Sequence, residues 1–193
     1  MTTVVLMGPP GAGKGTHAGM LADEVAVPAI STGDIFRAHL AAGSELGRKV
    51  QQYIDSGVYV PDEVTNAMIR ERLAEEDARS GFLLDGYPRT LDQAAVLDDL
   101  LATQGRELTA VIVLDVDREA LVQRLLRRAE IQGRSDDSEE VIRTRLEVYA
   151  EQTLPLVTLY GGRGLVHQID GNGDIEQVRQ RILEVTYTFT PTG

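Results

Sequence analysis

Short apolar runs rich in branched residues alternate along the chain with longer segments in which apolar residues recur every three or four positions. This alternation is typical of βα units that surround a parallel sheet, and it predicts an α/β fold. The apolar runs predict strands at residues 3–7, 82–85, 110–116 and 165–169, and a weaker one at 27–30. The helical spacing predicts covering helices at residues 14–25, 90–104, 118–129, 138–153 and 175–186.

One stretch, residues 33–78, departs from the simple alternation. It contains three segments with helical spacing, which are broken at Gly43 and between Gly57 and Pro61. We interpret it as an insertion of small helices between two strands. The polar residues 133–138 predict a short loop between helices, and residues 188–193 predict a loose tail.

The composition indicates a single globular domain, since 42% of the 193 residues are hydrophobic and 25% are charged. A formal net charge of −11 argues against general binding of nucleic acid or anionic membranes, so an anionic ligand needs a local cluster of Lys and Arg. No apolar run reaches the roughly 18 residues of a membrane span and no signal peptide is evident, so we expect a cytoplasmic protein. The absence of cysteine excludes disulfides, a catalytic thiol and cysteine-based zinc sites.

The first predicted strand leads into a glycine-rich loop at residues 8–16, which reads Gly-Pro-Pro-Gly-Ala-Gly-Lys-Gly-Thr. G-x-x-x-x-G-K between a strand and a helix is the pattern of a phosphate-binding loop, in which main-chain N–H groups and a helix N-terminus hold a polyphosphate. Lys14 adds a mobile positive charge, while Gly15 occupies the usual Ser/Thr position and the hydroxyl follows at Thr16. A plain turn with an exposed lysine is a poor explanation for four glycines and a lysine at this spacing.

Further candidate residues lie near the ends of the later strands. Asp85 ends an apolar strand at the edge where open α/β sheets bind ligands, and its carboxylate can serve Mg²⁺. Arg89 offers a planar fork suited to a phosphate. Arg124 lies beside the apolar stripe of its helix and Arg128 continues that stripe. This placement favours arginines that face a cleft over arginines that face solvent. The three histidines share no metal-ligand spacing, and we assign them no role.

Two further motifs accompany the phosphate loop: Ser-Thr-Gly-Asp at residues 31–34, followed by Arg37, and Asp-Gly-Tyr-Pro-Arg at residues 85–89. With Arg-Ser-Asp-Asp at residues 134–137, they resemble the short-lid adenylate kinases, which belong to the P-loop nucleoside monophosphate kinases. The resemblance implies a central five-stranded parallel sheet covered by helices, a helical AMP-binding insertion at residues 31–60 and a short lid at residues 128–138.

The resemblance also assigns roles to individual residues. It implies that ATP is bound by Gly11, Ala12, Gly13, Lys14, Gly15, Thr16, Arg128 and Gly173. It implies that AMP is bound by Thr32, Arg37, Val58, Tyr59, Val60, Gly86, Tyr87, Pro88, Arg89, Gln93, Arg134 and Arg145. Catalysis is implied for Lys14, Asp85, Arg89, Arg128, Arg134 and Arg145, and Mg²⁺, held mainly through water, is expected near Thr16 and Asp85.

For several of these residues an ordinary structural role remains open. The Thr32 hydroxyl suits a helix N-cap as well as a contact with AMP. Residues 57–60 suit simple packing, and Gly173 suits an ordinary turn. Asp136 and Asp137 either orient the arginines or form a solvated charge pair that caps the next helix.

The activity that the resemblance implies is reversible transfer of the terminal phosphoryl group from MgATP to AMP, which gives two ADP. The nearest alternative is a UMP/CMP kinase, in which the position of Thr32 is typically alanine; a nucleotide-binding switch without turnover is another. We expect Mg²⁺ but no structural zinc, because the lid segment has neither Cys nor His. The expected partners are ATP, AMP and ADP, without nucleic acid or membrane, and the expected state is a monomer.

Overall fold

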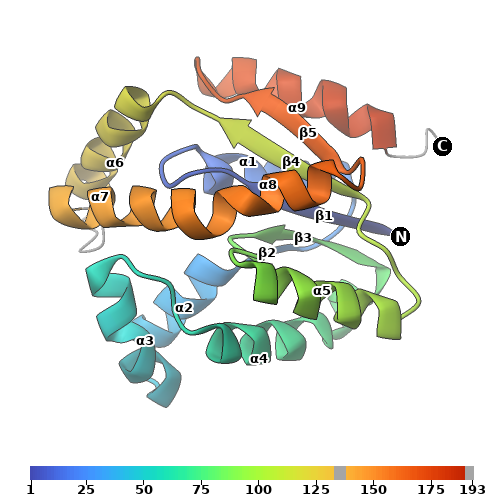
Figure 1. Ribbon diagram of the computed structural model, residues 1–193, viewed down its shortest axis with the longest axis horizontal. Coiled ribbons are helices and arrows are strands. Elements are labelled where there is room, and N and C mark those ends of the chain that lie inside the picture. The colour runs from blue at the N-terminus through green and yellow to red at the C-terminus, as the bar shows by residue number, and fades with distance from the viewer. Residues whose placement is uncertain (133–137, 190–193) are drawn as a thin grey trace.

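A five-stranded sheet forms the centre of the molecule (Figure 1). The computed structural model describes residues 1–132 and 138–189. All neighbouring strands are parallel, in the order β2-β3-β1-β4-β5. The strands are β1 (Thr2–Met7), β2 (Ala29–Ser31), β3 (Gly81–Asp85), β4 (Ala110–Asp115) and β5 (Val166–Asp170). The expected α/β fold with a five-stranded parallel sheet is therefore confirmed.

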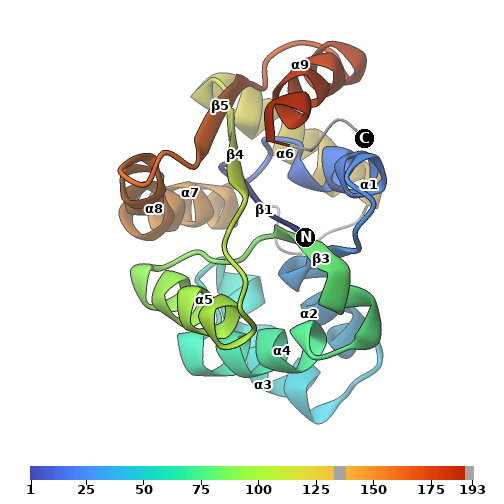
Figure 2. The ribbon, with the colours of Figure 1, turned by 90° about the vertical axis from the view of Figure 1, so that its right-hand side faces the viewer.

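Helices cover both faces of this sheet (Figure 2). The α1 and α9 helices lie on one side, and α5, α7 and α8 lie on the other. The helices are α1 (Lys14–Glu24), α2 (Thr32–Ala41), α3 (Glu45–Ser56), α4 (Asp62–Leu73), α5 (Leu91–Thr103), α6 (Arg118–Gln132), α7 (Glu139–Val148), α8 (Leu154–Gly161) and α9 (Ile175–Phe189). A 3-10 turn, η1 (Glu76–Ser80), precedes β3, and a π-helical turn, η3 (Tyr149–Thr153), joins α7 to α8.

The side chains of β1 alternate between two apolar cores. Val5 and Met7 belong to a core shared with α2–α5 and α8, and Val4 and Leu6 belong to a core shared with α1, α6 and α9. Because successive side chains of a strand point to opposite faces, a strand that is buried on both sides must be apolar throughout. This explains why the strands are recognisable as short apolar runs.

The helix boundaries agree with the sequence pattern except near η3. The insertion contains α2, α3 and α4, with breaks at Gly43 and at residues 57–61 as expected. The helix expected to end at residue 153 instead continues through η3 and α8 to Gly161. Pro155 lies at the start of α8, directly after the π-helical turn, and the first turn of a helix is where proline is best tolerated. The weak strand is also shifted, to Ala29–Ser31.

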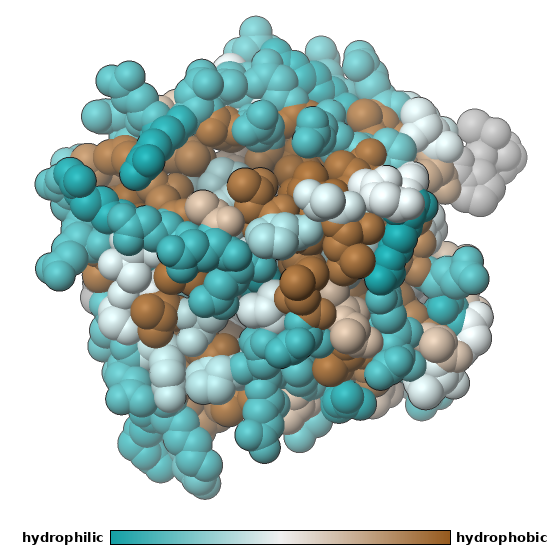
Figure 3. All heavy atoms as spheres, in the orientation of Figure 1, coloured by the Kyte–Doolittle hydropathy of each residue, from teal (hydrophilic) through white to brown (hydrophobic). Residues whose placement is uncertain are grey.

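The surface on which α8 lies is partly apolar. Figure 3 shows hydrophobic atoms gathered over the middle of this face, with hydrophilic atoms around its rim. The α8 sequence, LPLVTLYG, is almost entirely apolar; Leu156 and Tyr160 are fully buried, while Leu154 is 50% exposed. The α8 helix therefore contributes to the core with one side and leaves part of its apolar surface exposed.

Candidate functional site

Two neighbouring cavities open at the carboxyl ends of the central strands. The larger, of about 1150 Å³, lies over residues 10–17 and extends to α6 and to the turn at residues 171–174. The smaller, of about 90 Å³, is lined by α2, by residues 57–60 and by the segment between β3 and α5. Residues that line both cavities are Pro10, Gly33, Arg37, Gly86, Arg89 and Arg145. Three arginines therefore stand at the boundary between the two spaces.

The register of the sheet brings the sequence motifs to this edge. Asp85, the last residue of β3, pairs with Leu6 of β1 on one side and with Ser31 of β2 on the other. The glycine-rich loop begins at residue 8, just after Leu6 and the end of β1, and α2 begins directly after Ser31. The loop and the start of α2 therefore lie on either side of Asp85. The glycine-rich loop, the motif at residues 31–34 and the motif at residues 85–89 thus meet at one edge of the sheet. They are about 20 and about 50 residues apart in the sequence, roughly the length of one or two βα units.

The glycine-rich loop runs from β1 into the N-terminus of α1. Gly11 has a φ of +84°, and a Cβ there would lie 2.9 Å from Cγ of Leu125 on α6, so a side chain would strain the backbone and collide. Gly13 occupies the N-cap of α1 in the left-handed conformation. The free N–H groups and dipole of the α1 N-terminus therefore favour an anion in the larger cavity.

Lys14 folds back over this loop. Its Nζ donates hydrogen bonds to the carbonyl oxygens of Gly8 and Pro9, at 2.7 and 3.1 Å. Burial lowers the pKa of Lys14 to about 8; Asp85 opposes this change, and Arg89, Arg145 and Arg128 add to it. In the described part of the chain no carboxylate forms an ion pair with Lys14, and the neighbouring arginines add positive charge, so this position favours an anionic ligand.

Asp85 lies close enough to Lys14 for the two charges to influence each other, and it lines the larger cavity. Burial raises the pKa of this carboxyl, while the charges of Lys14 and Arg89 oppose that change. Thr16 lines the same cavity. The carboxylate of Asp85 and the hydroxyl of Thr16 are oxygen groups of the kind that Mg²⁺ prefers, and Mg²⁺ usually keeps several of its own waters.

Ser31, not Thr32, is the N-cap of α2, so the capping interpretation of Thr32 was wrong. The Ser31 Oγ accepts a hydrogen bond from the backbone N–H of Asp34, at 3.3 Å. The Thr32 Oγ1 instead donates to the carbonyl oxygen of Gly86, at 2.9 Å, and Thr32 lines the smaller cavity. The local sequence could not separate two adjacent hydroxyl residues, because only one of them takes the extended backbone of a cap.

Arg89 is held from several directions between the cavities. Its Nε donates to the Gly86 carbonyl oxygen at 2.7 Å, and its guanidinium carbon lies 4.9 Å from the centre of the Tyr59 ring. Thr153 Oγ1 donates to the Arg89 carbonyl oxygen at 2.8 Å. Because its only proton is used there, Thr153 Oγ1 accepts a hydrogen bond from the Tyr59 hydroxyl, at 2.7 Å. Thr153 comes from the π-helical turn η3, and no sequence signal marked it.

The other expected AMP residues divide into two groups. Val58, Tyr59, Val60, Gly86 and Gln93 line the smaller cavity together with Thr32 and the three arginines. Tyr87 and Pro88 are not among the lining residues of either cavity. The Tyr87 side chain is 1% exposed, and its hydroxyl donates to Asn66 Oδ1 and to the carbonyl oxygen of Gln93. Tyr87 therefore braces α4 against α5.

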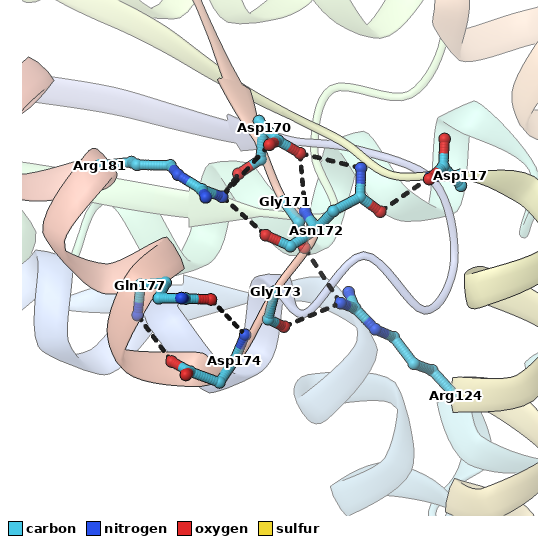
Figure 4. A network of polar contacts seen from close by, with 9 residues as sticks. All are labelled: Asp117, Arg124, Asp170, Gly171, Asn172, Gly173, Asp174, Gln177 and Arg181. Carbon is cyan, nitrogen blue, oxygen red and sulfur yellow. Dashed lines mark hydrogen bonds and ion pairs between the residues drawn. The ribbon is translucent and has the colours of Figure 1, made fainter.

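The turn that contains Gly173 lines the larger cavity. Figure 4 shows the polar contacts that hold this turn. Arg124 Nη2 donates to the carbonyl oxygens of Gly171 and Gly173, at 3.1 and 3.5 Å. On the other side of the turn, Arg181 Nη1 donates to the carbonyl oxygen of Asn172 at 2.6 Å. These arginines, from α6 and α9, hold the turn in place against the cavity.

Several lining residues were not assigned to a ligand in the sequence interpretation. Asp34, Arg124, Arg127 and His17 all line the larger cavity. Asp34 forms an ion pair with Arg37, and burial together with Arg124 lowers the pKa of His17. Of these four, Arg124 carried a signal in its place beside the apolar stripe of α6, and Asp34 is the last residue of the Ser-Thr-Gly-Asp motif.

Arg128 lines the larger cavity as expected, but Arg134, Asp136 and Asp137 lie outside the described residues. In the described ranges, no group of three or more His, Cys, Asp or Glu side chains could hold a metal ion. Among the helices that the structure describes, none has the length and apolar character needed to cross a membrane.

The chain is similar to known proteins over nearly its whole length. The model of a protein family described as adenylate kinase matches residues 6–165. The adenylate kinase of Thermobifida fusca is 59% identical over 93% of this chain and 95% of its own length. The adenylate kinase of Kocuria rhizophila is 54% identical over 95% of this chain and 97% of its own length. That of Nocardioides sp. is 52% identical over 94% of this chain and 95% of its own length.

Proposed function

The chain belongs to the adenylate kinase family, and we propose that its two cavities hold the two nucleotides of that family's reaction. It is a phosphotransferase that moves the terminal phosphoryl group of ATP to AMP and gives two ADP, and the reaction is reversible. The observation that carries the proposed placement is the position of Arg37, Arg89 and Arg145, which line both cavities. Cations at that boundary face the phosphates of both nucleotides at once.

The larger cavity takes ATP. Small-molecule pockets typically measure about 300–1,000 Å³, so its volume of about 1150 Å³ leaves room for a nucleoside triphosphate and for a second phosphate. The triphosphate lies in the loop of residues 11–16 at the N-terminus of α1, where Lys14 and Arg128 add positive charge. The adenine reaches the turn at Gly173, which lines this cavity.

The smaller cavity takes the base of AMP, with the phosphate of AMP directed towards the three shared arginines. Thr32, Gln93 and residues 58–60 surround the base. Residues 31–60 then form the AMP-binding subdomain, and residues 128–138 form the short lid over ATP. Arg134, Asp136 and Asp137 of that lid are assigned by family likeness alone.

The residues of the site supply charge and alignment without a general base. Phosphoryl transfer requires aligned oxygens and stabilised negative charge, and the three arginines with Lys14 provide both at the boundary between the cavities. The AMP phosphate attacks in line, so no phosphoenzyme forms. Mg²⁺, held mainly through water near Thr16 and Asp85, neutralises charge on the phosphate oxygens when it is bound.

A coupled assay of ADP formation with MgATP and each of AMP, CMP, UMP and GMP tests this assignment. We expect AMP to have the highest kcat/KM, since the relatives reported above are adenylate kinases. Equal use of CMP or UMP would point to a pyrimidine monophosphate kinase. ATP binding without any ADP formation would point to a nucleotide-binding switch.

We also propose that the protein is a cytoplasmic monomer that binds neither nucleic acid nor membranes. The net charge of −11 supports the absence of binding to nucleic acid and to anionic membranes, because both attract positively charged protein surfaces. Light scattering in solution should give a mass near 21.0 kDa. A mass of twice that value would contradict the monomer.

A further inference from the structure

Asp62, the first residue of α4, contacts Thr90, the N-cap of α5, and Gln93, in the first turn of α5. Its Oδ1 accepts a hydrogen bond from Gln93 Nε2 at 2.6 Å, and its Oδ2 accepts one from Thr90 Oγ1 at 2.6 Å. Asp62 is partly buried, and it is absent from the lining of both cavities, whereas Gln93 lines the smaller one. Asp62 can therefore affect a ligand in that cavity only through its neighbours.

The Gln93 amide is held in one orientation. Its Oε1 accepts a hydrogen bond from the backbone N–H of Arg89 at 2.7 Å, while its Nε2 donates to Asp62. A flipped amide would place its NH₂ group against the N–H of Arg89 and its carbonyl oxygen against a carboxylate, and both contacts are repulsive. Gln93 is only 1% exposed, so water cannot replace the lost partners.

This orientation limits what Gln93 can offer to a ligand. An amide has two N–H donors and a carbonyl oxygen with two lone pairs, so one donor and one lone pair remain. They match an edge with an acceptor nitrogen next to an amino group, which adenine presents at N1 and N6. Guanine presents the reverse pattern there, an N1–H donor next to the O6 acceptor, which only the flipped Gln93 amide would match.

We propose that Asp62 is a positioning residue that makes the acceptor site selective for a 6-amino purine over a 6-oxo purine, by locking the Gln93 amide. This inference rests on the proposed placement of the AMP base in the smaller cavity. Asp62 does not touch the substrate. Asp62 acts by making the flipped orientation of the Gln93 amide unfavourable, so that binding of a 6-oxo purine cannot induce the flip.

The test compares kcat and KM for AMP and GMP, with MgATP in excess, in the wild type and in Asp62→Ala. The AMP to GMP ratio of kcat/KM should fall by about five-fold or more in Asp62→Ala, because a good bidentate base contact is worth about 1–3 kcal/mol of discrimination. The change should be in KM for the acceptor, while KM for ATP stays the same. Should Asp62→Ala not fold, Asp62→Ser serves instead, because serine is favoured at helix starts and its hydroxyl is too short to reach Gln93.

Two controls separate positioning from a general effect on α4. Glu63→Ala removes an exposed carboxylate from the same helical turn and should keep the wild-type ratio. Asp62→Asn keeps an oxygen that can accept from Gln93 while its NH₂ group donates to the Thr90 hydroxyl, so it should restore most of the selectivity. An unchanged ratio in a less stable Asp62→Ala, or an equal loss of selectivity in Glu63→Ala, would reduce Asp62 to a stabiliser of α4 and overturn the inference.

Gln93→Ala distinguishes failure of this inference from failure of the proposed function. If Gln93→Ala loses the selectivity and Asp62→Ala retains it, Gln93 reads the base without help from Asp62, and only the positioning role is lost. If Gln93→Ala keeps the wild-type ratio, the base does not lie against Gln93, and the placement of AMP in the smaller cavity is itself wrong.

Discussion

Replacing Thr32 with valine tests the acceptor site at the point where the sequence left two interpretations open. The substitution keeps the shape of the side chain and removes one hydroxyl, which donates to the Gly86 carbonyl oxygen at 2.9 Å. That carbonyl also accepts from Arg89 Nε at 2.7 Å, so it keeps a partner in the variant. The cost to stability is therefore that of one hydrogen bond without an orphaned group, about 1 kcal/mol.

This loss should lower Tm by about 2–4 °C in a chain of 193 residues. If the hydroxyl also contributes to the acceptor site, a further interaction of about 1 kcal/mol should raise KM for AMP about five-fold. Selectivity for AMP over CMP should fall, because a site that pairs with a base rejects other bases through unsatisfied polar groups. KM for ATP should change little, since Thr32 lines only the smaller cavity.

Ser44→Ala is the matched control for stability. Ser44 caps α3 by accepting from the Gly47 N–H at 3.0 Å, and it lines neither cavity, so its loss should cost about 1 kcal/mol without affecting AMP. Calorimetry and acceptor kinetics on both variants complete the experiment. If Thr32→Val shows a similar loss of stability with wild-type KM and selectivity, Thr32 only braces α2 against β3 and leaves the site.

Four further outcomes are expected. Lys14→Ala should lower kcat by about 10²-fold or more, and near-normal turnover would contradict the phosphate-loop assignment. Asp85→Asn should raise the Mg²⁺ concentration needed for half-maximal rate without loss of fold, because burial already disfavours the charge of this carboxyl and raises its pKa; an unchanged Mg²⁺ requirement would remove it from the metal site. Titration calorimetry should show ATP binding weakening as pH rises above about 8, since Lys14, with a pKa of about 8, is charged below that pH and neutral above it, whereas Lys14→Arg stays charged and should lack this loss. Activity should survive zinc chelators when Mg²⁺ is in excess, and stoichiometric zinc in purified protein would show that the lid was misinterpreted.

The sequence by itself determined the scaffold and the phosphate loop. Strands buried on both faces must be apolar throughout, and covering helices must repeat at 3.6 residues, so both are visible without coordinates. The loop at residues 8–16 requires glycines where the backbone turns near α6 and a lysine at its end, so its pattern is also local. The breaks within the insertion at Gly43 and at residues 57–61 were visible for the same reason.

The tertiary structure alone decided which side chains share a space. Thr153 reaches Arg89 only because η3 changes the helical phase before α8, and Asp62 meets Gln93 only because α4 and α5 start side by side. Ser31 and Thr32 differ in role because one backbone is extended and the other helical. The hydrogen bonds of Asp62 with Gln93 and of Thr153 with Arg89 join residues that are 31 and 64 positions apart. Such bonds depend on how the helices pack on the sheet, and the periodic pattern of apolar residues does not contain that information.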